Sequence, residues 1–196
     1  MRYNTFIWLG LCLLLAACGG APPPQGDPAV ATGPSSRHPG VMCAPFAREL
    51  SGLPLYGDAD TWWTQAAGHY NRGSDPAPGG VLVFRRSARL ASGHVAVVSR
   101  VLGPRAVQVT QANWIPGQVD QDQLVVDVSE HNDWSAVRVW YTPQRQMGGA
   151  TYATYGFIQP PRPARHEELA RATEVAAVYA LDTHGRPPPR ARNLGL

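Results

Sequence analysis

The sequence contains no lysine, so all 17 of its basic residues are arginines. They are scattered along the chain apart from short clusters at 85–89 and 186–192, and the formal net charge is only +3. Proteins that bind nucleic acid usually present a continuous basic face with interleaved aromatic residues. No such face is indicated here, so the sequence excludes nucleic acid as the partner.

Cysteine is also scarce, with three residues in the whole chain. The sequence has neither a Cys-x-x-Cys pair nor a His-Glu-x-x-His motif, and it lacks a glycine-rich loop of the kind that cradles phosphate. It therefore predicts no metal site and no cofactor. Internal repeats with the periods of solenoids or propellers are missing as well.

Residues 1–17 are typical of an export signal. Arg2 supplies the positive start, residues 6–15 form the apolar stretch, and Cys18 directly follows two alanines. A membrane-spanning helix needs roughly 20 apolar residues, so this stretch is too short to remain as a span. The small residues before the cysteine resemble a bacterial lipobox. That resemblance implies that Cys18 carries a diacylglycerol anchor; an ordinary secretory signal is the alternative.

Residues 18–40 are rich in proline, glycine and serine, and we expect them to form a tether behind the lipidated cysteine. Gly19, and not an aspartate, follows Cys18. By analogy with lipoprotein sorting, this favours the outer membrane, facing the periplasm. The expected location is therefore the bacterial cell envelope, with the membrane as a partner through the lipid at Cys18.

Residues 41–160 form the predicted folded domain, and their length of about 120 residues suffices for one compact domain. We expect a helix over 43–50 that stops at Gly52, and a second helix capped by Asp60. Strands are predicted at 81–84, 93–98, 106–114, 124–128, 136–141 and 151–158. Helices followed by an antiparallel meander predict an α+β fold in which the N-terminal helices pack on an antiparallel β-sheet. Residues 161–196 are expected to add a surface helix over about 164–182 and a basic, proline-rich tail.

Cys43 is the one thiol that remains once the two cysteines of the export segment are set aside, so it has no partner for a disulfide. It stands at the start of the first predicted helix, where the partial positive charge of a helix N-terminus lowers a thiol pKa. A free cysteine is most often a small buried hydrophobe. In an oxidising envelope, however, a lone structural thiol is a liability, which makes Cys43 the candidate nucleophile.

His94 is the candidate general base, because it alone among the six histidines opens a hydrophobic strand, directly after Gly93. A third polar group must orient the imidazole, and Gln111 and Asn113 share one face of the next strand if no bulge intervenes. Either amide oxygen can accept from the ring N–H. We favour Asn113, because Trp114 beside it provides shielding.

Three tryptophans are candidates for contact with substrate. Trp62 and Trp63 lie in the second predicted helix, and Trp114 follows the strand that carries the amides. Tryptophans at helical spacing more often belong to the core, so both interpretations stay open for the first two.

Together these segments resemble the CHAP domain, the cysteine- and histidine-dependent amidohydrolase/peptidase family of the papain-like superfamily. The resemblance runs from about residue 41 to residue 141, through five segments in order: 43–48, 57–63, 78–84, 93–98 and 111–114. It implies a papain-like α+β fold, with Cys43 packed at the edge of a sheet that carries His94. It also implies peptidoglycan as the substrate.

The sequence departs from the family at one position. Many CHAP domains carry a glutamate where this chain has Gln111, with an asparagine two residues later. The departure assigns the third catalytic role to Asn113, and it leaves Gln111 as a supporting residue or as a hydrogen-bond donor to the oxyanion.

We therefore expect a peptidoglycan hydrolase, either an N-acetylmuramoyl-L-alanine amidase or an endopeptidase, with a Cys-His-Asn site. The alternative from another class is a catalytically silent wall-binding or assembly lipoprotein that retains the CHAP fold. An amidase acting on another bond, such as that of glutathionylspermidine, is a third possibility, and a lipid tether in the envelope disfavours it. Whether a protein partner activates the enzyme stays open.

Overall fold

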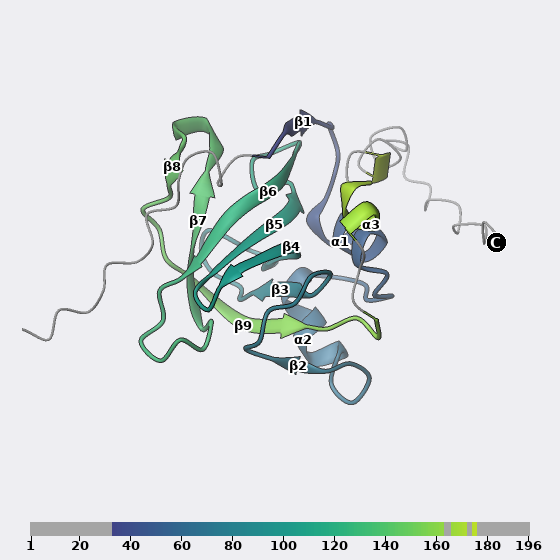
Figure 1. Ribbon diagram of the computed structural model, residues 1–196. Helices are drawn as coiled ribbons and strands as arrows, with labels where there is room; N and C mark the ends of the chain where they lie inside the picture. Colours follow the sequence, from purple (N-terminus) through teal and green to yellow (C-terminus); the bar gives the residue numbers. More distant parts are fainter. Residues whose placement is uncertain (1–32, 163–165, 172–173, 176–196) are drawn as a thin grey trace, which may run out of the picture.

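The computed structural model describes residues 33–162, 166–171 and 174–175 (Figure 1). Within these ranges, the helical elements are α1 (Cys43–Ser51), η1 (Ala59–Thr61), α2 (Trp62–Gln65), η2 (Thr142–Gln144) and α3 (His166–Ala170). The strands are β1 (Ser35–Arg37), β2 (Arg72–Gly73), β3 (Val81–Phe84), β4 (His94–Gly103), β5 (Ala106–Ala112), β6 (Gln118–Asp127), β7 (Ala136–Tyr141), β8 (Gln146–Met147) and β9 (Tyr152–Ile158).

Six of the strands close into an antiparallel β-barrel. β3 pairs with β4, β4 with β5, β5 with β6 and β6 with β7. The last strand, β9, pairs with β7 on one side and with β3 on the other, which completes the ring. Closure leaves these six strands without a free edge between them.

The barrel interior is filled by one hydrophobic cluster to which all six strands contribute. Trp134 and Phe157 are among its largest members, and their rings meet edge to face with centroids 5.1 Å apart. The remaining buried residues are Leu82, Phe84, Ala96, Val98, Val107, Val109, Val125, Val137 and Val139. Alternate residues along each strand point inward, as the period of two requires.

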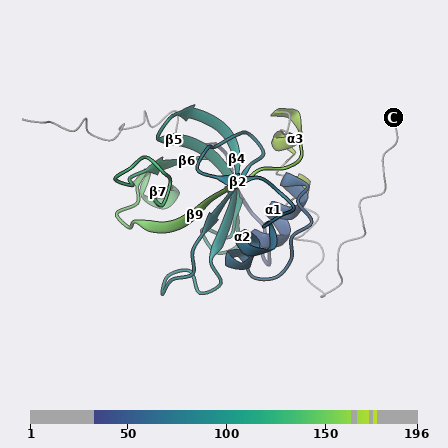
Figure 2. The same ribbon diagram turned by 90° about the horizontal axis from the view of Figure 1, so that it is seen from below.

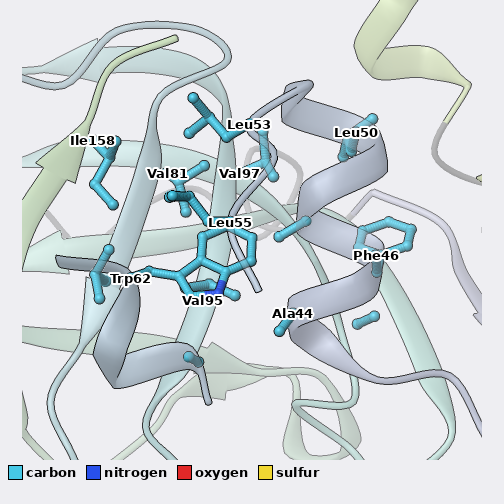
Figure 3. Packing of buried hydrophobic residues seen from close by; sticks show 14 of the residues in the cluster. Ala44, Phe46, Leu50, Leu53, Leu55, Trp62, Val81, Val95, Val97 and Ile158 are labelled. Carbon is cyan, nitrogen blue, oxygen red and sulfur yellow. The ribbon is translucent and has the colours of Figure 1, made fainter. Parts of the chain in front are cut away.

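A second cluster lies outside the barrel, between its wall and the N-terminal helices. Val81 and Val83 of β3 alternate with the inward-facing residues of that strand and belong to this second cluster, together with Phe46 of α1, which is fully buried. Figure 3 shows Val81 and Phe46 in this layer. In Figure 2, α1 and α2 lie together on one side of the strands. β3 is therefore buried on both faces, which explains its unbroken run of apolar residues.

The expected α+β architecture, a papain-like sheet covered by N-terminal helices, is wrong. The protein is mostly β, and its centre is the closed barrel. The helices do pack on the strands, but α1 has nine residues and α2 only four, so they cover part of the barrel wall. Strand alternation shows which residues face inward and does not show that β9 returns to β3.

Several local predictions are confirmed. Strands 81–84 and 136–141 have the predicted bounds. Helix α1 starts at Cys43, and Gly52 ends it in the left-handed conformation, with φ of 71° and its N–H bonded to the Arg48 carbonyl. The predicted cap at Asp60 is wrong, because its carboxylate accepts hydrogen bonds from Arg86.

The ends of the chain differ in part from expectation. Ser35–Arg37, predicted as tether, pairs as β1 with β6. Leu169 of α3 is buried in the cluster around α1, so this part of the predicted surface helix packs on the domain. The export signal, Cys18, most of the tether and the basic tail lie outside the described residues. No helix within the described ranges is long and apolar enough to cross a membrane.

Candidate active site

The Cys43 side chain sits at the first residue of α1. Met42 before it is extended, with φ of −118° and ψ of 145°, and its carbonyl accepts the first helical hydrogen bond from the Phe46 N–H. The chain therefore turns into the helix at the cysteine. The thiol is partly buried and not engaged in a disulfide.

The Cys43 sulfur contacts the strand that carries the candidate base. The backbone N–H groups of Val95, Ala44 and Cys43 itself point to the thiol and favour its ionised form. Burial outweighs them and raises the pKa of Cys43 above its ordinary value. The expected lowering by the helix N-terminus is thus not the net effect, and the resting group is the thiol.

His94 is the first residue of β4. Gly93 before it has φ of 70°, and a Cβ atom there would lie 2.7 Å from the Asp60 Cβ and 2.8 Å from the Phe84 carbonyl oxygen. The missing side chain of Gly93 therefore permits a close approach of two segments. It allows the loop that holds Asp60 to pack on the strand end, where the Asp60 N–H donates to the Ser92 carbonyl.

The His94 imidazole is enclosed by aromatic rings and only 3% exposed. Its centroid lies 5.5 Å from that of Phe84 and 5.0 Å from that of Trp114, both edge to face. Burial lowers the pKa of His94 to about 4, while the hydrogen bond from the ring to Gln111 acts in the opposite direction. At neutral pH the ring is therefore uncharged and able to accept a proton.

Gln111 fixes which ring nitrogen accepts that proton. The His94 Nε2 lies 2.8 Å from the Gln111 Oε1, and both side chains are buried. Because a carbonyl oxygen can only accept, Nε2 must carry the hydrogen, and the lone pair of the neutral ring then resides on Nδ1. Nδ1 is thus the basic atom of the site.

Asn113 occupies a different position from the one predicted. It lies past the end of β5 with φ of 60°, so strand alternation no longer places it beside Gln111. Its Oδ1 accepts from the Gly117 N–H at 3.0 Å, and its Nδ2 lies 3.8 Å from the Met42 sulfur. The structure brings Gln111, and not Asn113, into contact with His94.

Gln111 is also not placed to donate to an oxyanion. Its Nε2 donates to the Gln123 Oε1, and the Gln123 Nε2 donates to the Thr142 Oγ1 at 3.0 Å. The Thr142 hydroxyl in turn hydrogen-bonds the Asp120 carboxylate. These three polar residues behind Gln111 were not predicted from the sequence. The available signal was the polar run 120–123 directly before the apolar residues 124–126.

The three tryptophans predicted as candidates for substrate contact lie in different environments. Trp62 is fully buried in the cluster between α2 and the barrel wall, so its predicted contact with substrate is wrong (Figure 3). Trp63 is partly exposed and stacks on Tyr155 at 5.7 Å, away from the His94 rings. Trp114 is partly exposed and lies directly over His94.

The Cys43 thiol and the His94 imidazole lie on neighbouring segments, but they are not hydrogen-bonded to each other. Cys43 contacts the backbone of Val95, the residue after His94, whereas the structure has no hydrogen bond between the Cys43 and His94 side chains among its described residues. The described ranges also hold no group of three or more side chains suited to a metal ion. The arrangement brings together a thiol, a neutral imidazole and an amide that orients the imidazole.

Residues 33–113 match the family model of the CHAP domain. The chain contains a CHAP domain. No curated protein matches the chain. CHAP domains are typically amidohydrolases or peptidases, and the match suggests a peptidoglycan hydrolase or an amidase-type activity for this protein. Cys43, His94 and Gln111 all lie inside the matched segment, whereas Asp120, Gln123 and Thr142 follow it.

Proposed function

We propose that the protein is a cysteine amidohydrolase or peptidase that cleaves amide bonds of peptidoglycan, with Cys43 as nucleophile and His94 as general base and acid. The contact of the Cys43 sulfur with the backbone next to His94 carries the proposal. The bond from Nε2–H to Gln111 supports it, because it leaves the lone pair of Nδ1 for the thiol proton. Gln111 takes the orienting role that the sequence analysis gave to Asn113.

The first half of the proposed reaction starts from neutral groups. The Cys43 sulfur attacks the amide carbonyl carbon while its proton passes to Nδ1 of His94, so the thiolate and the imidazolium form only as the C–S bond forms. The backbone N–H of Cys43 is the proposed donor to the oxyanion. When the tetrahedral intermediate collapses, the C–N bond breaks and Nδ1 returns the proton to the leaving amine.

The second half releases the acyl group. Water attacks the thioester carbonyl and gives a proton to Nδ1, the C–S bond breaks, and the thiol reforms with that proton. The partly exposed Trp114 lies over His94, which supports a role for this residue at the edge of the substrate site. The Trp114 ring must move aside when the substrate carbonyl approaches the buried imidazole.

The proposed location is the bacterial cell envelope. A lipid on Cys18 would hold the domain at the outer membrane, facing the periplasm and its peptidoglycan. The support for this is the sequence of the first 18 residues.

A silent wall-binding lipoprotein is the second candidate, and a specific observation favours it. The Cys43 thiol has a raised pKa, and the His94 ring is enclosed and not bonded to it. A protein that has lost catalysis would tolerate these features.

Digestion of purified peptidoglycan separates the two candidates. We expect mass spectrometry to detect products with the full-length protein and none with Cys43→Ala. Free stem peptides would identify an amidase, and split cross-links an endopeptidase. Cleavage that persists in Cys43→Ala would contradict the mechanism. Absence of cleavage, combined with cosedimentation of both proteins with the wall, would favour the silent module.

A further inference from the structure

A continuous line of buried polar side chains runs from His94 across the barrel. The His94 ring meets Gln111 of β5, Gln111 meets Gln123 of β6, and Gln123 meets Thr142 at the end of β7. Thr142 hydrogen-bonds Asp120, again on β6. Asp120 is 1% exposed and is the only carboxylate in this line of described residues.

A β-bulge places two of these residues on one face. In a regular strand, positions 120 and 123 would point to opposite faces of β6. Here Val109 pairs with Gln123 and Gln111 pairs with Asp120, so one residue of β5 stands opposite two of β6, and Asp122 adopts φ of 49°. Since paired residues share a face, Gln123 and Asp120 both lie on the side of Gln111.

The direction of each hydrogen bond follows from the two ends of the line. A carboxylate only accepts, so the Thr142 hydroxyl donates to it and is left to accept from the Gln123 amide. The Gln123 oxygen then accepts from the Gln111 amide, and the Gln111 oxygen accepts from Nε2–H of His94. Every donor points toward Asp120.

We propose that Asp120 is a positioning residue for His94, supplying through Thr142, Gln123 and Gln111 the negative charge that a carboxylate beside the imidazole would supply directly. The proposal rests on the proposed function, because a charge on the far side of Nε2 matters most when Nδ1 takes the proton from Cys43. Successive hydrogen bonds polarise one another, so the charge strengthens the bond at Nε2. Ser35 supports the carboxylate by donating to its Oδ1 at 2.5 Å.

The first test replaces the charge and keeps the shape. In Asp120→Asn, the amide oxygen still accepts from Thr142, but the charge is gone. We expect kcat/KM on peptidoglycan fragments to fall about tenfold through kcat, the loss expected for a charge-assisted hydrogen bond. In NMR spectra of the full-length protein at pH 7, the Nε2–H proton of His94 should shift upfield.

A matched control separates this effect from a structural one. Asp122→Asn removes a carboxylate from the same bulge and should retain kcat and the Nε2–H shift. Ser35→Ala removes one hydrogen bond to the Asp120 carboxylate, so it should change both quantities in the direction of Asp120→Asn, but by less. If Asp120→Asn fails to fold, Thr142→Val breaks the line at a less buried position and should give the same two changes.

A rescue variant makes the test stricter. Gln111→Glu puts a carboxylate directly beside Nε2 of His94. The Gln123 amide must then turn so that its NH2 group donates to the new carboxylate, and the hydrogen bond from that group to Thr142 is lost. Asp120→Asn should then cost no further activity in the Gln111→Glu background.

Equal kcat and equal Nε2–H shifts in wild type, Asp120→Asn and Asp122→Asn would overturn the proposal. The NMR shift decides the point even if the wild-type protein proves inactive, so the positioning role and the proposed function fail separately.

Discussion

The His94 imidazole donates from Nε2 to the Gln111 amide oxygen across 2.8 Å in the interior of the barrel. The pair couples β4 to β5 at the end where α1 presents Cys43. An amide in this place orients the ring without charging it, and burial keeps the ring neutral at physiological pH. Before substrate binds, the site thus holds a neutral thiol next to a neutral imidazole. This resting state differs from that of a site with a preformed thiolate–imidazolium pair.

The reactivity of Cys43 tests that resting state. Because burial raises the pKa of the thiol, alkylation by iodoacetamide should be slow at pH 7 and should accelerate at a higher pH than alkylation of an unperturbed thiol does. Mass spectrometry of the labelled peptide follows the rate, with N-acetylcysteine as the reference thiol. Fast labelling of Cys43 at pH 6 would show that the free protein holds a thiolate and would contradict the raised pKa.

The buried His94 should make the fold sensitive to acid. The unfolded chain binds a proton at this residue near pH 6.5, whereas the folded protein does so only near pH 4. Between these values the unfolded state holds more protons, so the free energy of unfolding declines as the pH falls through this window, by about 3 kcal/mol in total. Urea unfolding at pH 7.5, 5.5 and 4 measures the decline.

Asp120 affects the stability in the opposite direction, because burial raises its pKa and protonation of its carboxyl therefore favours the folded state. A variant without the His94 imidazole separates the two contributions. In His94→Gln the Asp120 contribution remains and that of His94 is lost. As the pH falls, the free energy of unfolding should therefore decline more in the wild type than in His94→Gln. A pH-independent difference would contradict the lowered pKa of His94.

Gly93 is the position where a side chain should do most damage near the site. In Gly93→Ala, φ of 70° is unfavourable, and the new methyl would lie within 2.8 Å of Phe84 and Asp60 backbone atoms. We expect a loss of about 2 kcal/mol or more in the free energy of unfolding. Gly103→Ala at the other end of β4 is the matched control, since a Cβ there meets nothing within 4 Å. Equal stabilities of the two variants would refute the packing argument.

Local features of the site followed from the sequence because they depend on neighbouring residues. A helix start at Cys43, a stop at Gly52 and a strand that opens at His94 each have a short-range signal. The choice between Gln111 and Asn113 could not be made in this way. It depends on where β5 ends and on the left-handed turn at Asn113, which alternation does not encode.

The barrel and the polar line behind Gln111 depend on pairings between distant segments. β9 joins β3 across 70 to 77 positions of sequence, from the pair Phe84 and Thr154 to the pair Val81 and Ile158, and this pairing converts an open sheet into a barrel. The bulge at Asp122 brings Gln123 and Asp120 to one face, although a regular period of two places them on opposite faces. Both features require the register between strands, which no single strand specifies.

The closed barrel can be tested at its last strand. Phe157 of β9 is fully buried in the interior cluster, and Tyr155, two positions earlier, lies partly exposed beside Trp63. Phe157→Ala should lower the free energy of unfolding by about 3–5 kcal/mol, the usual cost of removing a buried ring. Tyr155→Ala should cost clearly less. Similar losses in urea titrations would mean that β9 does not close the barrel with Phe157 inside.

Trp114 controls the environment of the His94 imidazole. Its ring covers His94 edge to face at 5.0 Å, and burial is the largest cause of the lowered pKa of that histidine. Trp114→Ala admits water to the imidazole, so the pKa of His94 should rise from about 4 toward 6.5. A 15N NMR titration of the ring measures the shift, and the acid limb of kcat/KM should move to higher pH by the same amount. Trp63→Ala, a tryptophan of similar exposure away from His94, is the control and should leave both values in place. An unchanged titration in Trp114→Ala would show that the barrel wall alone, through Phe84 and Gln111, excludes water from the base.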